Sequence, residues 1–340
     1  MRKSSKGNDP TTLPSVRTGI GPHGYRHLQL LLWLLVYVLS TQLDKALSVD
    51  AVDRYPLIWL PAGIALAGAI WFGWSILPWL VAGSFVVNAG YILTTDVAIT
   101  PVQAVAICFA LMTLDVSQMI FAYWLWQRFV DAGLATVQSY LKFVFIVCTI
   151  PYLITAFGYG LMLWLVTPAL HAWDATRLAV LLVQLGTGDA VAVFMVVPLI
   201  WAWRRPDRRW GQTLIGVAFC MLLVLAASIW QETVAVNLLF LAMPMLMFLA
   251  LVFGLQGITL GIFALGMWIV GVGAQQNIGP LQLEIDPWYV GMIGRLILVG
   301  IPMEAIAVLY EQLRKQQHTL EAEVALRTEG MARSQAAPAK

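Results

Sequence analysis

Charged side chains are scarce in this sequence. Only 11% of its 340 residues are Asp, Glu, Lys or Arg, whereas 60% are hydrophobic. An ordinary soluble domain carries roughly 25% charged residues, so these charges are too few to cover a soluble particle of this size. The 15 Trp residues suit the aromatic belts that mark membrane interfaces. The composition therefore excludes a soluble domain and predicts an all-α, polytopic transmembrane helix bundle.

Cysteine and histidine are also rare. The three cysteines, Cys108, Cys148 and Cys220, lie inside apolar runs without metal-ligand spacing, and we expect them to be buried as small hydrophobic residues. All four histidines lie outside the apolar runs, which argues against a haem or a metal ion held between transmembrane helices. We also find no P-loop, no Rossmann glycine run and no basic surface interleaved with aromatic residues. We therefore expect no enzymatic activity, no cofactor, no metal and no nucleic-acid partner.

Long apolar runs fill most of the chain. A helix that crosses a bilayer needs about 20 apolar residues, and ten runs qualify as predicted spans. They are 28–47, 57–74, 76–95, 101–126, 140–167, 176–201, 211–230, 234–252, 256–274 and 288–310. Only Trp74-Ser75 separates the second span from the third, which predicts a helical hairpin. The polar, basic residues 1–27 form a predicted disordered segment, and 28–310 form the predicted membrane domain.

The basic residues orient these spans. Clusters of Lys and Arg occur in the N-terminal segment, in the loop after the fourth span and at 203–209 after the sixth span. With ten spans, all three clusters fall on one side of the membrane, and the other loops are acidic on balance. Because cytoplasmic loops carry the excess of Lys and Arg, we predict a bacterial inner-membrane protein with both termini in the cytoplasm.

The C-terminal end changes in character. Apolar residues in 304–327 fall near a heptad stripe, with charged residues on the other face. This pattern predicts that the last span continues into a cytoplasmic coiled-coil helix, which would make the protein a homodimer. An ordinary amphipathic tail is the alternative. We expect residues 328–340 to be disordered.

Ionisable residues inside predicted spans are few, and such residues are costly in a bilayer and often functional. At a helical rise of 1.5 Å per residue, Asp115 and Asp189 lie about 20 Å from the outer ends of their spans. Glu304 lies about 24 Å in, whereas Arg295 and Asn88 lie only about 10 Å in. The sequence therefore predicts an inner carboxylate layer below a layer that contains Arg295 and Asn88.

Two carboxylates at one depth have three interpretations. They form a hydrogen-bonded lock between helices with one carboxyl group protonated, a site for a cation or polar ligand, or part of a proton path. The pairing alone does not choose between them. The start of the second span adds Trp59 as an interfacial anchor, Pro61 in the first helical turn and Gly63 on a packing face.

Residues 58–90 resemble the start of a MASE1 domain, a membrane-associated sensor domain of bacterial signalling proteins. That family typically shows a start with Trp, Pro and Gly, an aromatic turn with Pro, and a Gly-Ser-Phe run followed by Asn. The matching residues here are Trp59, Pro61, Gly63, Pro78, Gly83, Ser84, Phe85 and Asn88.

Later residues extend the resemblance. The Leu-Glu pair that is common in the next span of the family is Leu114-Asp115 here, a conservative departure. The family's Gly-Asp element with a later Pro corresponds to Gly188, Asp189 and Pro198, although the aromatic pair that often precedes it is missing.

The resemblance covers roughly residues 30–315 and implies a sensory input domain. In the family, such a domain usually precedes a histidine kinase, a diguanylate cyclase or a c-di-GMP phosphodiesterase, to which a helical linker connects it. This sequence has no phosphoacceptor segment and no GGDEF or EAL motif, so we expect an isolated sensor, natural or cut from a longer protein. Its expected partners are the lipid bilayer, a small-molecule signal or partner membrane protein, and a second copy of itself.

Two other functional classes stay open. Broken helices and buried carboxylates permit a small-solute or ion transporter, although the two halves show no convincing internal repeat. A membrane-embedded enzyme is less favoured, because no nucleophile–base pair is visible. The candidate ligand-binding or signal-coupling residues are Asp115, Asp189, Asn88, Arg295, Glu304, Trp59, Pro61, Gly63 and Gly188.

Overall fold

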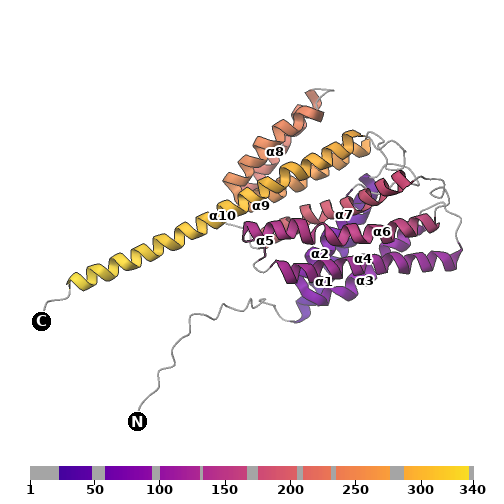
Figure 1. The fold of residues 1–340 in the computed structure, drawn as a ribbon, viewed down its shortest axis with the longest axis horizontal. Coiled ribbons are helices and arrows are strands. Elements are labelled where there is room, and N and C mark those ends of the chain that lie inside the picture. The colour runs from indigo at the N-terminus through magenta and orange to yellow at the C-terminus, as the bar shows by residue number, and fades with distance from the viewer. Residues whose placement is uncertain are drawn as a thin grey trace, which may run out of the picture.

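The computed structural model describes residues 23–47, 58–93, 100–130, 133–166, 175–204, 210–230, 235–275 and 287–336. All regular structure in these ranges is helical, which confirms the predicted all-α class there (Figure 1). The α-helices are α1 His23–Leu47, α2 Leu60–Phe72, α3 Leu77–Ile92, α4 Pro101–Phe129, α5 Val137–Lys142, α6 Ile150–Val166, α7 Ala175–Trp203, α8 Trp210–Trp230, α9 Ala235–Gln275 and α10 Pro287–Ala336. A 3₁₀ turn, Gly73–Ile76, joins α2 to α3, and a π-helical turn, Phe143–Val147, lies between α5 and α6.

Six helical stretches among the described residues are long and apolar enough to cross a membrane. They are Leu60–Ile92, Pro101–Phe129, Val137–Met162, Leu185–Trp203, Ala242–Gly271 and Ile293–Glu329. These stretches support a membrane protein, whereas the predicted count of ten spans is not confirmed. Part of α8, Trp210–Ala226, is apolar but shorter than the six. The three cysteines are buried, as predicted.

The chain reverses between α2 and α3. Gly73 has a φ of 64°, which favours glycine because other residues carry a Cβ that clashes there. Ala62 near the start of α2 and Ser84 in the middle of α3 both lie beside Asp115 of α4. Both helices therefore run between the Gly73 turn and the level of Asp115, as the predicted hairpin requires.

A second reversal divides α9. Gly254 has φ 61° and ψ −148°, which is not helical. A Cβ added at Gly261 would lie 2.6 Å from Leu249 and 3.2 Å from Leu246, so these residues pack against each other across the break. A continuous helix would hold residues 246 and 261 about 22 Å apart. The halves 235–253 and 255–275 are therefore antiparallel, and they match two separately predicted spans, 234–252 and 256–274.

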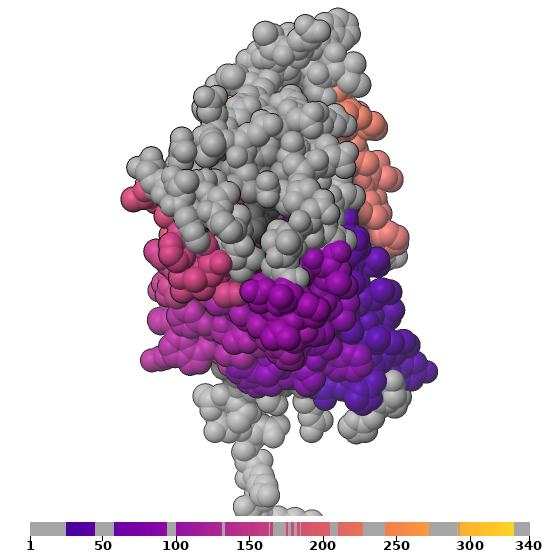
Figure 2. Space-filling view, turned by 90° about the vertical axis from the view of Figure 1, so that its right-hand side faces the viewer, coloured from indigo at the N-terminus to yellow at the C-terminus, as the bar shows by residue number. Residues whose placement is uncertain are grey.

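The helix α7 forms the centre of the bundle. Each residue from 191 to 197 is buried, and α7 packs against α2, α6 and α9. The helix α2 approaches α7 closely at Gly63, where an added Cβ would lie 2.5 Å from the carbonyl oxygen of Ala192. The predicted packing role of Gly63 is thereby explained. Figure 2 shows α1 in indigo and α8 in orange on the outside of the bundle, where their many exposed apolar side chains lie.

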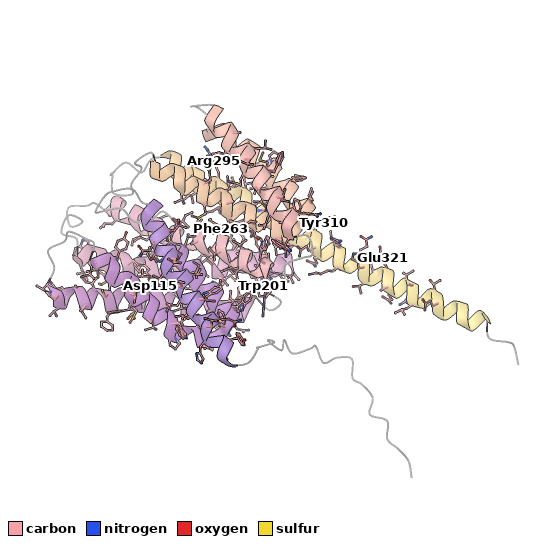
Figure 3. The ribbon with its side chains drawn as sticks, turned by 180° about the vertical axis from the view of Figure 1, so that it is seen from behind. Asp115, Trp201, Phe263, Arg295, Tyr310 and Glu321 are labelled. Atoms are coloured by element: carbon pink, nitrogen blue, oxygen red, sulfur yellow. The ribbon has the colours of Figure 1, made fainter. Side chains whose placement is uncertain are left out.

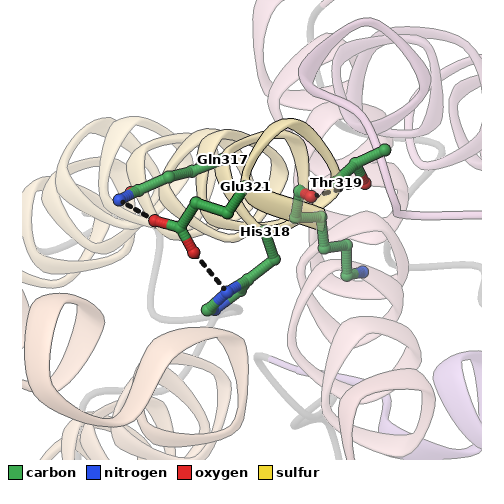
Figure 4. A network of polar contacts seen from close by, with 5 residues as sticks. Gln317, His318, Thr319 and Glu321 are labelled. Carbon is green, nitrogen blue, oxygen red and sulfur yellow. Dashed lines mark hydrogen bonds and ion pairs between the residues drawn. The ribbon is translucent and has the colours of Figure 1, made fainter. Parts of the chain in front are cut away.

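The helix α10 extends far beyond the bundle (Figure 1). From Leu313 to Glu329 every side chain is exposed, and the polar contacts there are made within the helix. Glu321 accepts from Gln317 at 2.9 Å and pairs with His318 at 3.4 Å (Figure 4). The helix continues to Ala336, past the predicted end at residue 327. The coiled coil over 304–327 stays a prediction.

Of the predicted N-terminal segment, only 23–27 are described, and they begin α1.

The tight contact of α2 with α7 predicts that Gly63→Ala destabilises the bundle. The added Cβ meets backbone atoms that cannot rotate away, and such overpacking costs roughly 1–3 kcal/mol. Gly90→Ala on α3 is the matched control, because a Cβ there meets no atom within 4 Å. Thermal unfolding of both variants in detergent measures the difference, and equal stability of the two would contradict the packing account.

Candidate functional site

Hydrogen-bond donors from two other helices converge on Asp115 of α4. Ser84 Oγ donates to Asp115 Oδ2 at 2.5 Å, and Asn88 Nδ2 donates to the same oxygen at 2.9 Å. The Tyr159 hydroxyl of α6 donates to Asp115 Oδ1. A carboxylate withdrawn from water is costly unless such bonds replace its hydration. Asp115 therefore ties α3, α4 and α6 together.

The second carboxylate, Asp189 of α7, is connected to the first through Gln118. Gln118 Nε2 donates to Asp189 Oδ2 at 2.6 Å, and Gln118 Oε1 lies 3.4 Å from the Tyr159 hydroxyl, whose single proton it shares with Asp115. Gln118 is 3% exposed and Asp189 7% exposed, so this link is buried. A continuous polar network, which we call the carboxylate cluster (Ser84, Asn88, Asp115, Gln118, Tyr159 and Asp189), thus joins α3, α4, α6 and α7.

A small cavity opens beside the carboxylate cluster. Its volume is about 10 Å³, which is enough for one water molecule. It is lined by Tyr37, Trp59, Pro61, Ala62, Ala65, Asp115, Gln118, Met119 and Tyr152. The Tyr152 hydroxyl is buried and has no hydrogen-bond partner among the described residues. A molecule larger than water can therefore enter only if the surrounding helices separate.

The start of α2 closes the cavity on another side. The Trp59 backbone N–H donates to the Gly188 carbonyl at 3.4 Å, next to Asp189. The next N–H, that of Leu60, donates to Asp44 Oδ2 at 3.2 Å, so that a carboxylate from α1 caps α2. The predicted site residues Trp59, Pro61 and Gly188 therefore do lie together with the two aspartates.

The predicted two-layer arrangement is wrong for Asn88, which bonds directly to Asp115. The depth count placed the first residue of each span at the outer membrane surface. The 29 residues of α4 extend about 44 Å, well beyond a hydrocarbon core of about 30 Å, so a residue count from one helix end does not give the depth of a side chain.

Two other predicted residues lie outside the carboxylate cluster. Arg295 is on α10, well away from Asp115 (Figure 3), so it does not bridge the two predicted layers. Glu304, also on α10, is fully buried, and neither carboxyl oxygen has a hydrogen-bond partner among the described residues. The Tyr140 hydroxyl lies near the Glu304 carboxyl group and donates to the Ile301 carbonyl at 3.4 Å. Glu304 therefore belongs to the packing of α10, not to the carboxylate cluster.

Sequence reasoning missed several residues of this site. Gln118 has a usable signal, because it follows Asp115 by one helical turn and shares its face. Tyr159 and Tyr152 lie in an apolar run where nothing in the spacing marks them. Asp44 lies near the end of a predicted span, and the sequence suggests only a loop charge.

The chemistry of the site is that of a buried polar network. Among the described ranges, no group of three or more His, Cys, Asp or Glu side chains is placed to hold a metal ion. No basic side chain of the described residues pairs with Asp115 or Asp189. The bonds between helices favour the lock interpretation for the arrangement seen here, and any molecule bound beside Asp115 would have to compete with these bonds.

Comparison with known proteins identifies one family. The family model described as MASE1 matches residues 27–286, which confirms the predicted resemblance. The match ends just before α10 begins at Pro287. No curated protein and no solved structure matches the chain.

The convergence on Asp115 predicts that Tyr159→Phe destabilises the bundle. The change removes one donor and leaves Asp115 Oδ1 without its bond, which costs roughly 1–3 kcal/mol. Tyr310→Phe on the exposed face of α10 is the control. Chemical or thermal unfolding in the same detergent compares them. If the two phenylalanine variants unfold alike, Tyr159 does not support Asp115.

Proposed function

The chain belongs to the MASE1 family, a family of membrane sensor domains, and we propose that it detects a signal within the membrane and relays it through α10 to a cytoplasmic output module. The output module is a kinase or an enzyme of c-di-GMP metabolism, as the family implies. The signal is a small molecule or a partner membrane protein. The protein acts in the bacterial inner membrane with both termini in the cytoplasm, and it is not itself an enzyme.

The carboxylate cluster is the observation that supports this proposal. Its hydrogen bonds join four helices, and a cavity of about 10 Å³ lies beside them. A signal shifts such a bundle only if it binds two arrangements with different affinity. Breaking one bond to Asp115 or Asp189 changes the relative stability of the arrangements. The cluster is therefore suited to set the balance between two signalling states.

The predicted site residues take different parts in this proposal. Asp115, Asp189 and Asn88 set the balance, while Trp59 and Pro61 shape the cavity. Gly63 lets α2 approach α7 closely, and the Gly188 carbonyl accepts from the Trp59 N–H at the start of α2. Arg295 and Glu304 act on α10 itself, away from the carboxylate cluster.

The helix α10 is the element that would connect the bundle to the output module. Its exposed part carries Leu313, Leu320 and Val324, apolar side chains spaced close to a heptad repeat. We propose that two copies pair through 304–327 and that the paired helices carry the change to the output module.

A fusion of the chain to a diguanylate cyclase module after α10 tests the function. Asp115→Asn and Asp189→Asn keep the side-chain shape but change the hydrogen bonding of the carboxylate cluster. We expect each to change cyclase activity in membranes by about fivefold or more, the usual range of coupling between sites. Thr113→Val is the control, since Thr113 is an exposed residue of the same helix. Unchanged activity in both aspartate variants would overturn the proposal.

Transport is the rival function, because buried carboxylates near helix breaks also occur in transporters. Proteoliposomes that contain the chain separate the two. Solute or ion uptake that Asp189→Asn abolishes, together with unchanged cyclase activity in the fusion, would favour a transporter.

A further inference from the structure

The hairpin turn of α9 carries an unusual backbone conformation. Gly254 has φ 61° and ψ −148°, a region that only glycine adopts without strain. The turn begins a new helix at Leu255, and the first N–H groups of any helix have no partner within it. Leu255 N–H donates to Glu311 Oε1 of α10 at 3.0 Å. A carboxylate from the output helix therefore caps the second half of α9.

Glu311 lies closely against this turn. A Cβ added at Gly254 would lie 2.8 Å from Glu311 Oε1. The N-terminus of a helix carries a partial positive charge, which favours a carboxylate at this place. The later acidic residues of α10 differ, because Glu321 and Glu323 are exposed and pair within their own helix. Glu311 thus fixes α10 to α9 at the point where α10 leaves the bundle.

The same turn is also bonded to the end of α7. Gln256 Nε2 donates to the Ala202 carbonyl at 3.1 Å, and Trp203 Nε1 donates to the Gln256 carbonyl at 3.2 Å. Between Asp189 and Trp203, α7 is about 21 Å long, and the helix continues through Pro198, which lacks one backbone hydrogen bond. A displacement of α7 at the carboxylate cluster therefore reaches the residues that hold Glu311.

We propose that Glu311 is a positioning residue that couples the output helix to the carboxylate cluster, in the order Asp189, α7, the Gly254 turn and α10. This inference rests on the proposed sensory function. In the arrangement seen here Glu311 holds α10 at the turn. A signal that displaces α7 disturbs the bonds of Ala202 and Trp203 to the turn and changes the direction in which α10 leaves the membrane.

Amide hydrogen exchange in the full chain tests the cap. In Glu311→Ala the Leu255 amide loses its partner, and we expect the peptide that contains it to exchange on the order of tenfold faster or more. Glu311→Gln keeps an oxygen that accepts this bond, so its exchange should stay close to the wild type. Glu323→Ala is the matched control on the exposed part of α10. Equal exchange in Glu311→Ala and Glu323→Ala would show that Glu311 is not the cap.

The cyclase fusion tests the coupling. Asp189→Asn should change cyclase activity in the otherwise unaltered chain and in Glu323→Ala, but not in Glu311→Ala, because there the change no longer reaches α10. If Asp189→Asn acts equally in the Glu311→Ala background, the coupling through Glu311 is wrong while the sensory function stands. If neither Asp189→Asn nor Asp115→Asn has an effect in any background while Glu311→Ala alone changes activity, the carboxylate cluster is not the sensor and the proposed function fails.

Discussion

The hydrogen bonds to Asp115 are the interaction on which the rest of the bundle depends. Inside a bilayer no bulk water replaces a lost hydrogen bond, so a polar side chain is stabilised most when the protein supplies its partners. Asp115 finds them on α3 and α6, and Gln118 extends the connection to Asp189 on α7. Apolar packing alone allows helices in a membrane to slide, because lipid is as apolar as their side chains. These bonds fix which helices meet and at what height.

The backbone N–H groups at helix starts also need hydrogen-bond partners from the protein. The first N–H groups of α2 and of the second half of α9 have no partner within their own helices. Each is capped by a carboxylate from a distant helix, Asp44 in one case and Glu311 in the other. Acidic residues of this chain thus connect helices through hydrogen bonds. One such connection lies beside the carboxylate cluster and another lies where α10 leaves the bundle. The fold therefore offers a continuous path from the carboxylate cluster to α10.

The sequence predicts the helices and two of the site residues of this fold, but it does not predict which side chains meet. Apolar runs mark the helices, and the predicted spans 234–252 and 256–274 correspond to the two halves of α9. The two aspartates stand out because they are rare in apolar surroundings. Tyr159 does not stand out, since its role depends on the face of α6 that meets α4. Asn88 was placed at the wrong depth, because helix length and tilt decide the height of a residue and a residue count contains neither.

If the carboxylate cluster controls the position of α10, a change in its hydrogen bonds must move that helix. Spin labels attached at positions 127 and 314, both exposed, report the distance between the end of α4 and the output helix in lipid nanodiscs. We expect Asp115→Asn to shift the distance distribution between these labels, whereas Thr113→Val leaves it unchanged. Superimposable distributions for wild type, Asp115→Asn and Thr113→Val would show that the carboxylate cluster does not control α10.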